Sequence, residues 1–247
     1  MLLTATIDVG ETPNVERADV DIRFEDYVTS LRKWLKQSRF KKIVFVENSD
    51  FDVRLISESI SSVITDVDLE ILSFDGFVYE PALGKGYGEK EIIKYAMTNS
   101  KLLNQCDGFV KVNGRYFVAQ LGDLISLLPV NMDIFSDLRP CFDYSDSRIF
   151  YCSKRFYSSF LERALDGIDE RIQFYFEHAL AKAIMSSIRV GFRFRLMPPI
   201  EIDGFSGSQG HSHQRSAKRK AGDYAKFFCR RLVYFAILRR KAKCEIN

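Results

Sequence analysis

A chain of 247 residues that is 46% hydrophobic and 28% charged has the composition of a folded globular protein, which excludes intrinsic disorder. At this length we expect one large domain, alone or with a small appendage. No apolar stretch approaches the roughly 18–20 residues that span a bilayer, and we expect no signal peptide because the first residues lack a basic region. Five cysteines without a CxxC pair favour a reducing, cytoplasmic setting over a disulfide framework or a structural zinc site.

The net charge of +3 is unevenly distributed along the chain. Residues 215–247 hold 11 Lys and Arg against two acidic residues, so this end carries +9 and residues 1–214 carry −6. An acidic body with a basic tail predicts two separate tasks for the two parts.

The first half of the chain alternates between strand-like and helix-like segments. The apolar residues of 24–37 follow the i, i+3, i+4, i+7 spacing of an amphipathic helix, and 42–46 is a short β-branched run. We expect strands at 1–7, 42–46, 69–74 and 108–118, and helices at 24–37, 53–63 and 89–104. This order predicts an α/β fold with a mostly parallel, Rossmann-type sheet flanked by helices.

The pattern is looser after Pro129. We expect a strand at 148–153, helices at 156–165 and 168–188, and a loop at 201–214, which is rich in Gly, Ser and His. The predicted organisation is a main domain over 1–200, a flexible loop or lid over 201–222 and a basic amphipathic tail over 223–247.

Polar residues occupy the ends of the first three predicted strands. Ligands of open α/β sheets bind beyond the carboxyl ends of the strands, so these residues are candidates for a nucleotide-binding rim. The alternative is that they are ordinary polar strand ends. The candidates are Thr4, Thr6, Asp8, Glu47, Asn48, Ser49, Ser73 and Asp75.

A glycine-rich stretch, Gly84-Lys85-Gly86-Tyr87-Gly88-Glu89, leads into the third predicted helix. Glycines let backbone N–H groups approach an anion, and the helix N-terminus and Lys85 add positive charge. The stretch matches neither the P-loop nor the GxGxxG pattern, so a plain turn is an equal alternative. Glu89 in the first helical turn is either a ligand contact or a helix-stabilising acid.

The fourth predicted strand carries an unusual set of polar residues. Alternation places Lys111, Asn113 and Arg115 on one face, away from Val110 and Val112. Two cations are costly to bury unpaired, so we expect an anionic ligand, a carboxylate partner or exposure to solvent.

Taken together, KKIVFVENSDFD, LEILSFDG, GKGYGEKEIIKYAMTNSKLL, FVKVNGRYFV, SRIFYCSKRFY and GFSGSQG resemble, in the same order, bacterial surface-polysaccharide glycosyltransferases of the GT-A type. The resemblance covers about residues 1–210. It implies a nucleotide-sugar donor at the strand ends, contacted by Thr4, Thr6, Glu47, Asn48, Ser49, Lys85, Gly86, Gly88, Glu89, Asn113 and His178, with the segment around Ser206 and Gly207 as a lid. We expect Arg148 to contact a donor phosphate or to pair with an acidic neighbour. The lid segment has a plain linker as its alternative.

One departure from that family affects the predicted chemistry. Its members carry an Asp-x-Asp metal motif where this chain has Lys111-x-Asn113-Gly114-Arg115. We therefore expect no required metal or other cofactor, with Lys111, Arg115 and Lys85 offsetting the charge of the leaving group.

The resemblance also directs the search for a catalytic base to the 168–188 helix. Glu177, next to His178, is the first candidate to accept a proton from the acceptor hydroxyl, with Asp143 and Asp146 as rivals. A solvated helix charge is the alternative for Glu177. His211 and His213 have a metal-compatible spacing but lie in the predicted loop.

The basic tail contains an apolar run, Leu232–Leu238, framed by arginines. We expect Tyr224–Lys243 to lie on an anionic membrane surface. The alternatives are packing against the core and an oligomer contact. Nucleic-acid binding is a further rival for a basic tail, but the long aliphatic run argues against it, so we expect no nucleic-acid partner.

The combined hypothesis is a glycosyltransferase at the cytoplasmic membrane face that transfers a sugar to a lipid-linked or growing surface-polysaccharide acceptor. The rivals are a non-catalytic nucleotide- or glycan-binding module and a nucleic-acid-associated protein.

Overall fold

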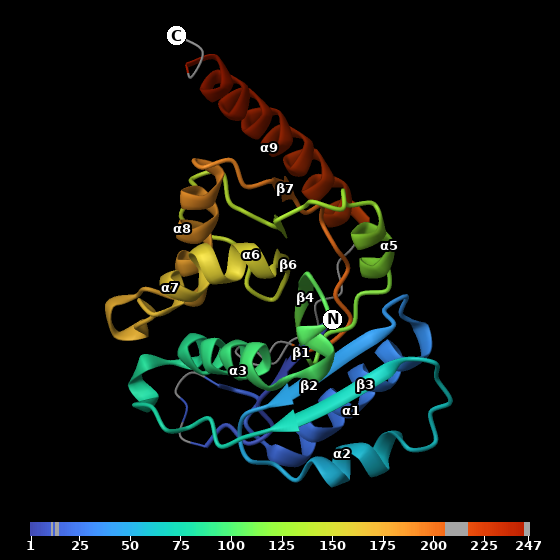
Figure 1. Cartoon of the computed structure of the whole chain (residues 1–247). Coiled ribbons are helices and arrows are strands. Elements are labelled where there is room, and N and C mark those ends of the chain that lie inside the picture. Colours follow the sequence, from blue (N-terminus) through green and yellow to red (C-terminus); the bar gives the residue numbers. More distant parts are fainter. Residues whose placement is uncertain (11, 13–14, 206–216, 245–247) are drawn as a thin grey trace.

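The computed structural model describes residues 1–10, 12, 15–205 and 217–244, with the side chains of 221–234 in the last range. The described residues form a seven-stranded sheet with helices on both faces (Figure 1). Its order is β3-β2-β1-β4-β6-β5-β7. The strands are β1 (Leu2–Ala5), β2 (Lys42–Glu47), β3 (Asp68–Ser73), β4 (Gly108–Asn113), β5 (Ile134–Ser136), β6 (Ile149–Ser153) and β7 (Phe194–Leu196).

The α/β class and the mostly parallel sheet predicted from the sequence are confirmed. Strands β1 to β4 are mutually parallel where they pair, β5 pairs with β7 in parallel, and β6 is antiparallel to both β4 and β5. The three-residue strands β5 and β7 were not predicted, because segments this short show no periodicity.

Two hydrophobic cores cover the two faces of the sheet. One face is covered by α1 (Val20–Gln37), α2 (Val53–Ile60) and α5 (Leu121–Ser126). The other is covered by α3 (Lys85–Asn99), α4 (Lys101–Asn104), α6 (Lys154–Phe156), α7 (Glu162–Leu165) and α8 (Phe176–Ile188). Successive strand residues alternate between these cores, as the pleat requires: Leu2 and Val44 face α3, and Leu3 and Phe45 face α1.

The direction of winding reverses between β1 and β4. The chain proceeds outward from β1 through β2 to β3 and then returns to place β4 on the other side of β1. Thr4 at the end of β1 is the register partner of Asn113 at the end of β4. A crevice outside the carboxyl ends of two such strands is where open α/β sheets bind ligands.

Side-chain caps explain where the first helices begin. Helix α1 begins four residues before the predicted start because Asp19 accepts a hydrogen bond from the Ile22 N–H at 2.9 Å. Asp52 caps α2 in the same way, through the Arg54 N–H. Helix α3 begins at Lys85, so the glycine-rich stretch lies inside its first turns instead of preceding it as a loop.

The predicted 168–188 helix is wrong in its first part. A single 3₁₀ turn at Glu170–Ile172 ends at Gln173, whose φ of 60° cannot continue a helix, and α8 begins only at Phe176. This break places Glu177 in the first turn of α8. The predicted 156–165 helix is present as α6, a π-helical turn at Tyr157–Leu161 and α7.

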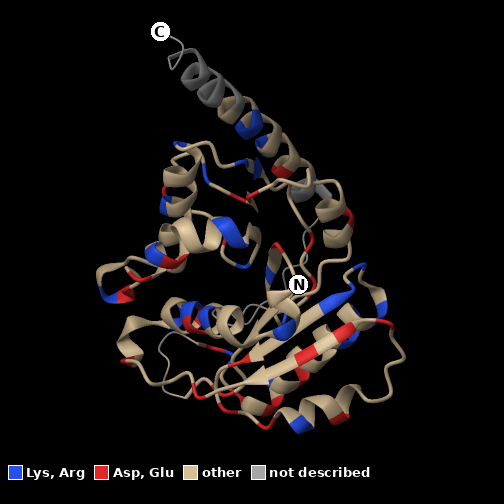
Figure 2. Ribbon diagram, viewed as in Figure 1, with Lys and Arg blue, Asp and Glu red and all other residues tan. Residues whose placement is uncertain are grey.

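The C-terminal helix α9 (Ala217–Cys244) begins inside the segment predicted as loop. Phe227 and Tyr234 are buried against the α8 side of the sheet, and the Tyr234 hydroxyl donates to the Leu138 carbonyl at 2.7 Å. An ion pair of 2.6 Å joins Arg230 to Asp137. Figure 2 shows basic residues along this helix. None of the helices in the described ranges is both long and apolar enough to cross a membrane.

Candidate functional site

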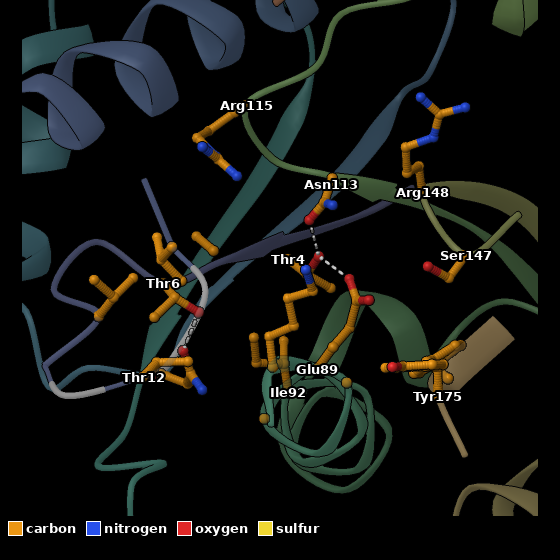
Figure 3. Close-up of a pocket in the computed structure, with 18 of the residues that line it drawn as sticks. Thr4, Thr6, Thr12, Glu89, Ile92, Asn113, Arg115, Ser147, Arg148 and Tyr175 are labelled. Atoms are coloured by element: carbon orange, nitrogen blue, oxygen red, sulfur yellow. Dashed lines mark hydrogen bonds between the residues drawn. The ribbon is translucent and has the colours of Figure 1, made fainter. Parts of the chain in front are cut away.

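A cavity of about 380 Å³ opens at the switch point between β1 and β4 (Figure 3). Its walls come from the ends of β1, β2 and β4, the loop before β6, and the first turns of α1, α3 and α8. This volume lies within the range of small-molecule sites. The polar lining residues are Thr4, Thr6, Thr12, Arg23, Tyr27, Asn48, Tyr79, Lys85, Glu89, Asn113, Arg115, Tyr116, Tyr144, Ser147, Arg148, Glu170, Tyr175 and Glu177.

Lys111 lies beneath this cavity and does not line it. The side chain is fully buried, forms an ion pair with Glu89 and donates to the Ser147 carbonyl at 2.7 Å. The alternation along β4 correctly predicted that Lys111 and Val110 lie on different faces of the strand. In the structure the Lys111 side chain lies in the packed layer under α3 and α8. Of the three alternatives for this cation, a carboxylate partner is the one observed. Lys111 therefore holds Glu89 in position and is not a free leaving-group clamp.

Glu89 has a second contact that fixes its carboxylate at the cavity floor. Its Oε1 lies 3.2 Å from the hydroxyl of Thr4, which is also 3.4 Å from Oδ1 of Asn113 (Figure 3). Lys111, Thr4 and Glu89 thus form one polar cluster that joins β1, β4 and α3. Such a cluster orders the floor of the cavity because each buried group has a partner.

Among the described residues that line this cavity, Arg115 is the one whose buried side-chain nitrogens lack a hydrogen-bond partner. It follows a turn at Gly114, whose N–H donates to the Thr4 carbonyl at 2.8 Å and where an added Cβ would lie 2.9 Å from that oxygen. The side chain of Arg115 is only 9% exposed, and its Nε and Nη1 are buried without a hydrogen-bond partner. Figure 3 shows the guanidinium group directed into the cavity. A permanently charged, buried and unpaired donor is costly, so this geometry favours an anionic ligand.

Three further cations line the cavity. Arg148 forms a two-pronged contact with Asp146, with nitrogen–oxygen distances of 2.5 and 2.9 Å. Burial alone would raise the pKa of Asp146. The hydrogen bonds and positive charge of Arg148 together outweigh burial and hold this pKa below its usual value. Lys85, the first residue of α3, is exposed at the rim. Arg23 is buried, and its guanidinium donates to the Thr6 and Ile7 carbonyls, so it fixes the loop after β1.

The glycines of α3 accommodate protein groups. The Gly86 N–H donates to the Glu170 carboxylate at 2.9 Å, and a Cβ on Gly84 would lie within 2.4 Å of the Glu170 side chain. A Cβ on Gly88 would lie 2.4 Å from the Tyr79 hydroxyl. In this structure the N–H of Gly86, which we expected to face a phosphate, faces a carboxylate. Glycine is therefore needed at these positions because the side chains of Glu170 and Tyr79 lie where a Cβ atom would be.

Glu177 lines the cavity from the first turn of α8. Its Oε1 accepts a hydrogen bond of 2.7 Å from the Ser147 hydroxyl. Burial raises the pKa of Glu177, and the negative charges of Glu89 and Asp146 raise it further. A carboxylate with a raised pKa is a stronger proton acceptor, as a general base requires.

The rival bases differ from Glu177 in their surroundings. Asp143 is exposed, and a hydrogen bond from the Cys141 thiol lowers the pKa of its carboxyl. Asp146 is engaged by Arg148, as described above. Among the three candidates, Glu177 alone combines a place in the cavity lining with a raised pKa.

Three residues expected at the donor site have structural roles outside the cavity lining. Glu47 is fully buried and accepts hydrogen bonds from the Ile7, Ser49 and Phe51 amides at 2.9–3.0 Å, which ties the ends of β1 and β2 together. The Ser49 hydroxyl accepts from the Asp8 N–H at 3.0 Å. The Nδ1 of His178 accepts from the Tyr175 N–H at 3.1 Å and thereby caps α8.

Of the other expected residues, some line the cavity and some lie outside the residues that the structure describes. Asn48 lines the cavity and accepts a 2.6 Å hydrogen bond from Thr6, so the second strand exit does contribute to the rim. Ser206, Gly207, His211 and His213 lie outside the described residues. Within the described ranges, no group of three or more His, Cys, Asp or Glu side chains is placed to hold a metal ion.

Several aromatic lining residues were missed by sequence analysis. Burial and the charge of Glu177 raise the pKa of Tyr144 to about 12, and burial and Glu170 raise the pKa of Tyr79 to about 12. Both phenols are therefore protonated hydrogen-bond donors at neutral pH. Tyr27 accepts from the Thr6 N–H and lies 5.7 Å from the Arg115 guanidinium. Their sequence neighbourhoods offer no pattern that separates them from core tyrosines.

Comparison with known proteins found no matching family model and no match among curated proteins. Among solved structures, the mannosyltransferase Ktr4p from S. cerevisiae is similar with a TM-score of 0.46 and 11% identity, covering 81% of this chain and 69% of that one. The core-mannan synthase A of Aspergillus fumigatus in its Mn/GDP form gives 0.46 and 9%, covering 82% and 73%. A cytidylyltransferase from Leptospira borgpetersenii gives 0.43 and 13%, covering 80% and 74%. These are similarities in chain path, and the functional argument below depends on the cavity.

Proposed function

We propose that this protein is a glycosyltransferase that takes a sugar from a nucleotide-sugar donor. The observation that carries the proposal is Arg115, a buried guanidinium with unpaired N–H groups, in the same switch-point cavity as the Glu177 carboxylate. A nucleoside diphosphate would place its anionic oxygens in the cavity that Arg115 lines, beside this incompletely satisfied cation, and Glu177 would supply a proton acceptor. The resemblance of residues 1–210 to surface-polysaccharide glycosyltransferases supports the same assignment.

The donor diphosphate is proposed to lie against Arg115, with Lys85 and Arg148 at the rim. Fixed cations offset the charge that develops on a departing nucleoside diphosphate and so lower the barrier to its departure. In this proposal a divalent metal is not required, and Lys111 is not part of the clamp. Arg148 lines the rim, but its charge is offset by Asp146.

Glu177 is proposed to act as the general base. The acceptor O–H bond breaks as its oxygen bonds the anomeric carbon, the proton passes to the Glu177 carboxylate, and the carbon–oxygen bond to the nucleoside diphosphate breaks with its electron pair on the leaving group. Ser147 keeps Oε1 in place, so the other carboxylate oxygen is the one that faces the acceptor.

The acceptor is proposed to be lipid-linked or a growing surface polysaccharide, reached at the cytoplasmic face of a membrane. Support comes from an exposed stripe of α9 that lies beside the face carrying Phe227 and Tyr234. There Tyr224, Phe228 and Leu232 recur every four residues and are 47%, 56% and 70% exposed, next to basic residues. An apolar stripe beside cations suits the surface of an anionic membrane.

A thermal-shift panel tests the donor site. UDP, GDP, CMP and dTDP are added separately, in EDTA and in Mn²⁺, to the wild type, to Arg115→Gln and to the matched control Arg163→Gln, which alters an exposed arginine on α7. A ligand that binds only the folded form raises the melting temperature. We expect one nucleotide to stabilise the wild type and the control in EDTA, and Arg115→Gln to lose the shift.

Two results contradict parts of the proposal. Stabilisation only with Mn²⁺ keeps a nucleotide site but removes the metal-independent clamp. No shift with any nucleotide, in EDTA or in Mn²⁺, removes the donor site itself and leaves a binding module for another ligand.

A further inference from the structure

A second cavity, of about 640 Å³, lies between α9 and the segment that follows β7. One wall is apolar and the other is the inner side of α9. The lining residues are Asp137, Pro140, Asp146, Arg148, Ile149, Met197, Pro198, Pro199, Ile200, Ile202, Asp223, Ala225, Lys226, Cys229 and Arg230. This list contains no Ser, Thr, Asn, Gln, Tyr or His, so the cavity lacks the neutral polar groups that usually recognise sugar hydroxyls.

The charges in this cavity largely compensate one another. Arg148 is paired with Asp146, and Arg230 is paired with Asp137 at 2.6 Å, while the Nε of Arg230 is buried without a hydrogen-bond partner. Asp223 and Lys226 have opposite charges, so three acids stand against three bases. A cavity with balanced charges and an apolar wall favours an uncharged apolar ligand over a phosphate group.

The two cavities meet at the loop before β6. Arg148 lines both of them, Asp146 lines the second, and Ser147 lines the first, where it holds Glu177. Arg148 is therefore the common boundary of the two cavities, and its neighbour Ser147 holds the candidate base. No other charged side chain is shared between the two lining sets.

The second cavity also adjoins the exposed stripe of α9. Ala225 and Cys229 line the cavity, and their sequence neighbours Tyr224 and Phe228 belong to the exposed apolar stripe. The exposed stripe and the cavity-lining residues are therefore adjacent along α9.

We infer that the second cavity binds the apolar chain of an amphiphilic acceptor, whose polar head group extends past Arg148 to Glu177. The inference depends on the proposed transfer reaction for the role of the head group, but binding of the chain is measured separately.

Calorimetry with n-dodecyl β-D-maltoside below its critical micelle concentration tests the inference, with maltose as the ligand that lacks the chain. The blocking variant is Ala225→Trp, which fills the cavity from an exposed helix position and so leaves the core intact. The matched control is Val233→Trp, which adds the same side chain to the same helix at an exposed residue outside the cavity.

We expect dodecyl maltoside to bind the wild type and Val233→Trp alike, maltose to give no heat, and Ala225→Trp to bind the detergent about tenfold or more weakly, because several methylenes lose their burial. No binding of dodecyl maltoside, equal binding of maltose, or unchanged binding to Ala225→Trp overturns the inference. The nucleotide shift of Ala225→Trp, measured alongside, remains if the donor site is correct, so failure of the chain site is distinguished from failure of the transferase assignment.

Discussion

The hydroxyl of Ser147 donates a 2.7 Å hydrogen bond to Oε1 of Glu177, and this contact joins the loop before β6 to the first turn of α8. The same loop carries Asp146 and Arg148, which line the second cavity. The candidate base is therefore held by the segment that lies between the two cavities. In the proposed reaction, this one loop both positions the proton acceptor and borders the site of the acceptor molecule.

Glu177→Gln tests the role of the base. The amide keeps the shape and can still accept from Ser147 but cannot take a proton, so turnover should fall by about 10²-fold or more while nucleotide binding is retained. Sugar transfer and the nucleotide-dependent thermal shift are measured on the same preparation. A variant that keeps wild-type turnover would exclude Glu177 as the base.

The same substitution has a predicted effect on stability. Burial raises the pKa of Glu177 above its ordinary value, so the folded protein disfavours the ionised form. The cost is fully present above the folded pKa and disappears as the pH falls below the unfolded value. Glu177→Gln should therefore melt at a higher temperature than the wild type at pH 7, with a smaller difference at pH 4. An equal difference at both pH values would contradict the raised pKa.

Ser147→Ala should shift the pH profile of turnover. The Ser147 hydrogen bond lowers the pKa of Glu177, so its loss raises that pKa further and moves the acidic limb of kcat/KM to higher pH. The stability cost should be about 1 kcal/mol, that of one hydrogen bond. The control is Ser158→Ala, at an exposed serine outside the cavity. A uniform loss of rate without movement of the acidic limb would show that Ser147 does not act through Glu177.

Strand β4 shows which features of this site the sequence predicts and which it does not. Alternation correctly separated Lys111 from Val110 and Val112, but it carries no information about depth, and Lys111 proved to be fully buried. The prediction that Arg115 shares the face of Lys111 is wrong, because β4 ends at Asn113 and not at residue 118. After the turn at Gly114, Arg115 lies beside Tyr27 of α1 and lines the cavity. The parallel strands β1 to β4 were predictable because strands buried on both faces are continuous apolar runs. Glu47 was misplaced because a polar strand end looks the same whether it faces a ligand or backbone amides. The break at Gln173 depends on a local backbone conformation that helical periodicity does not report.

Lys111→Met tests the buried ion pair. It leaves Glu89 without its cationic partner in the packed layer beneath the cavity, so the free energy of unfolding should fall by about 3–5 kcal/mol, as measured by urea denaturation. The double variant Lys111→Met, Glu89→Gln should recover part of this loss. A large loss of turnover with no change in stability would instead support a direct contact between Lys111 and the leaving group.

Leu232→Asp should weaken binding to vesicles that contain anionic lipid. Leu232 is 70% exposed on the stripe of α9, so the substitution removes apolar area and adds a negative charge without altering the docked face. Vesicle co-sedimentation should show several-fold weaker binding with an unchanged melting temperature. Tyr234→Phe, which removes the hydroxyl contacts to the Leu138 and Arg139 carbonyls, should give the opposite pattern of lower stability and normal vesicle binding. Wild-type vesicle binding by Leu232→Asp would exclude the stripe as the membrane contact.

Arg115, whose Nε and Nη1 are buried without a partner, is proposed to bind the donor diphosphate, and Arg115→Met tests this role most directly. Without ligand, replacing an unsatisfied buried guanidinium by an apolar side chain should leave the melting temperature equal or higher, since such a group costs about 1–3 kcal/mol. With the nucleoside diphosphate that stabilises the wild type, the variant should bind about 10- to 100-fold more weakly and show little shift. Equal stabilisation of both proteins by that nucleotide would contradict the account.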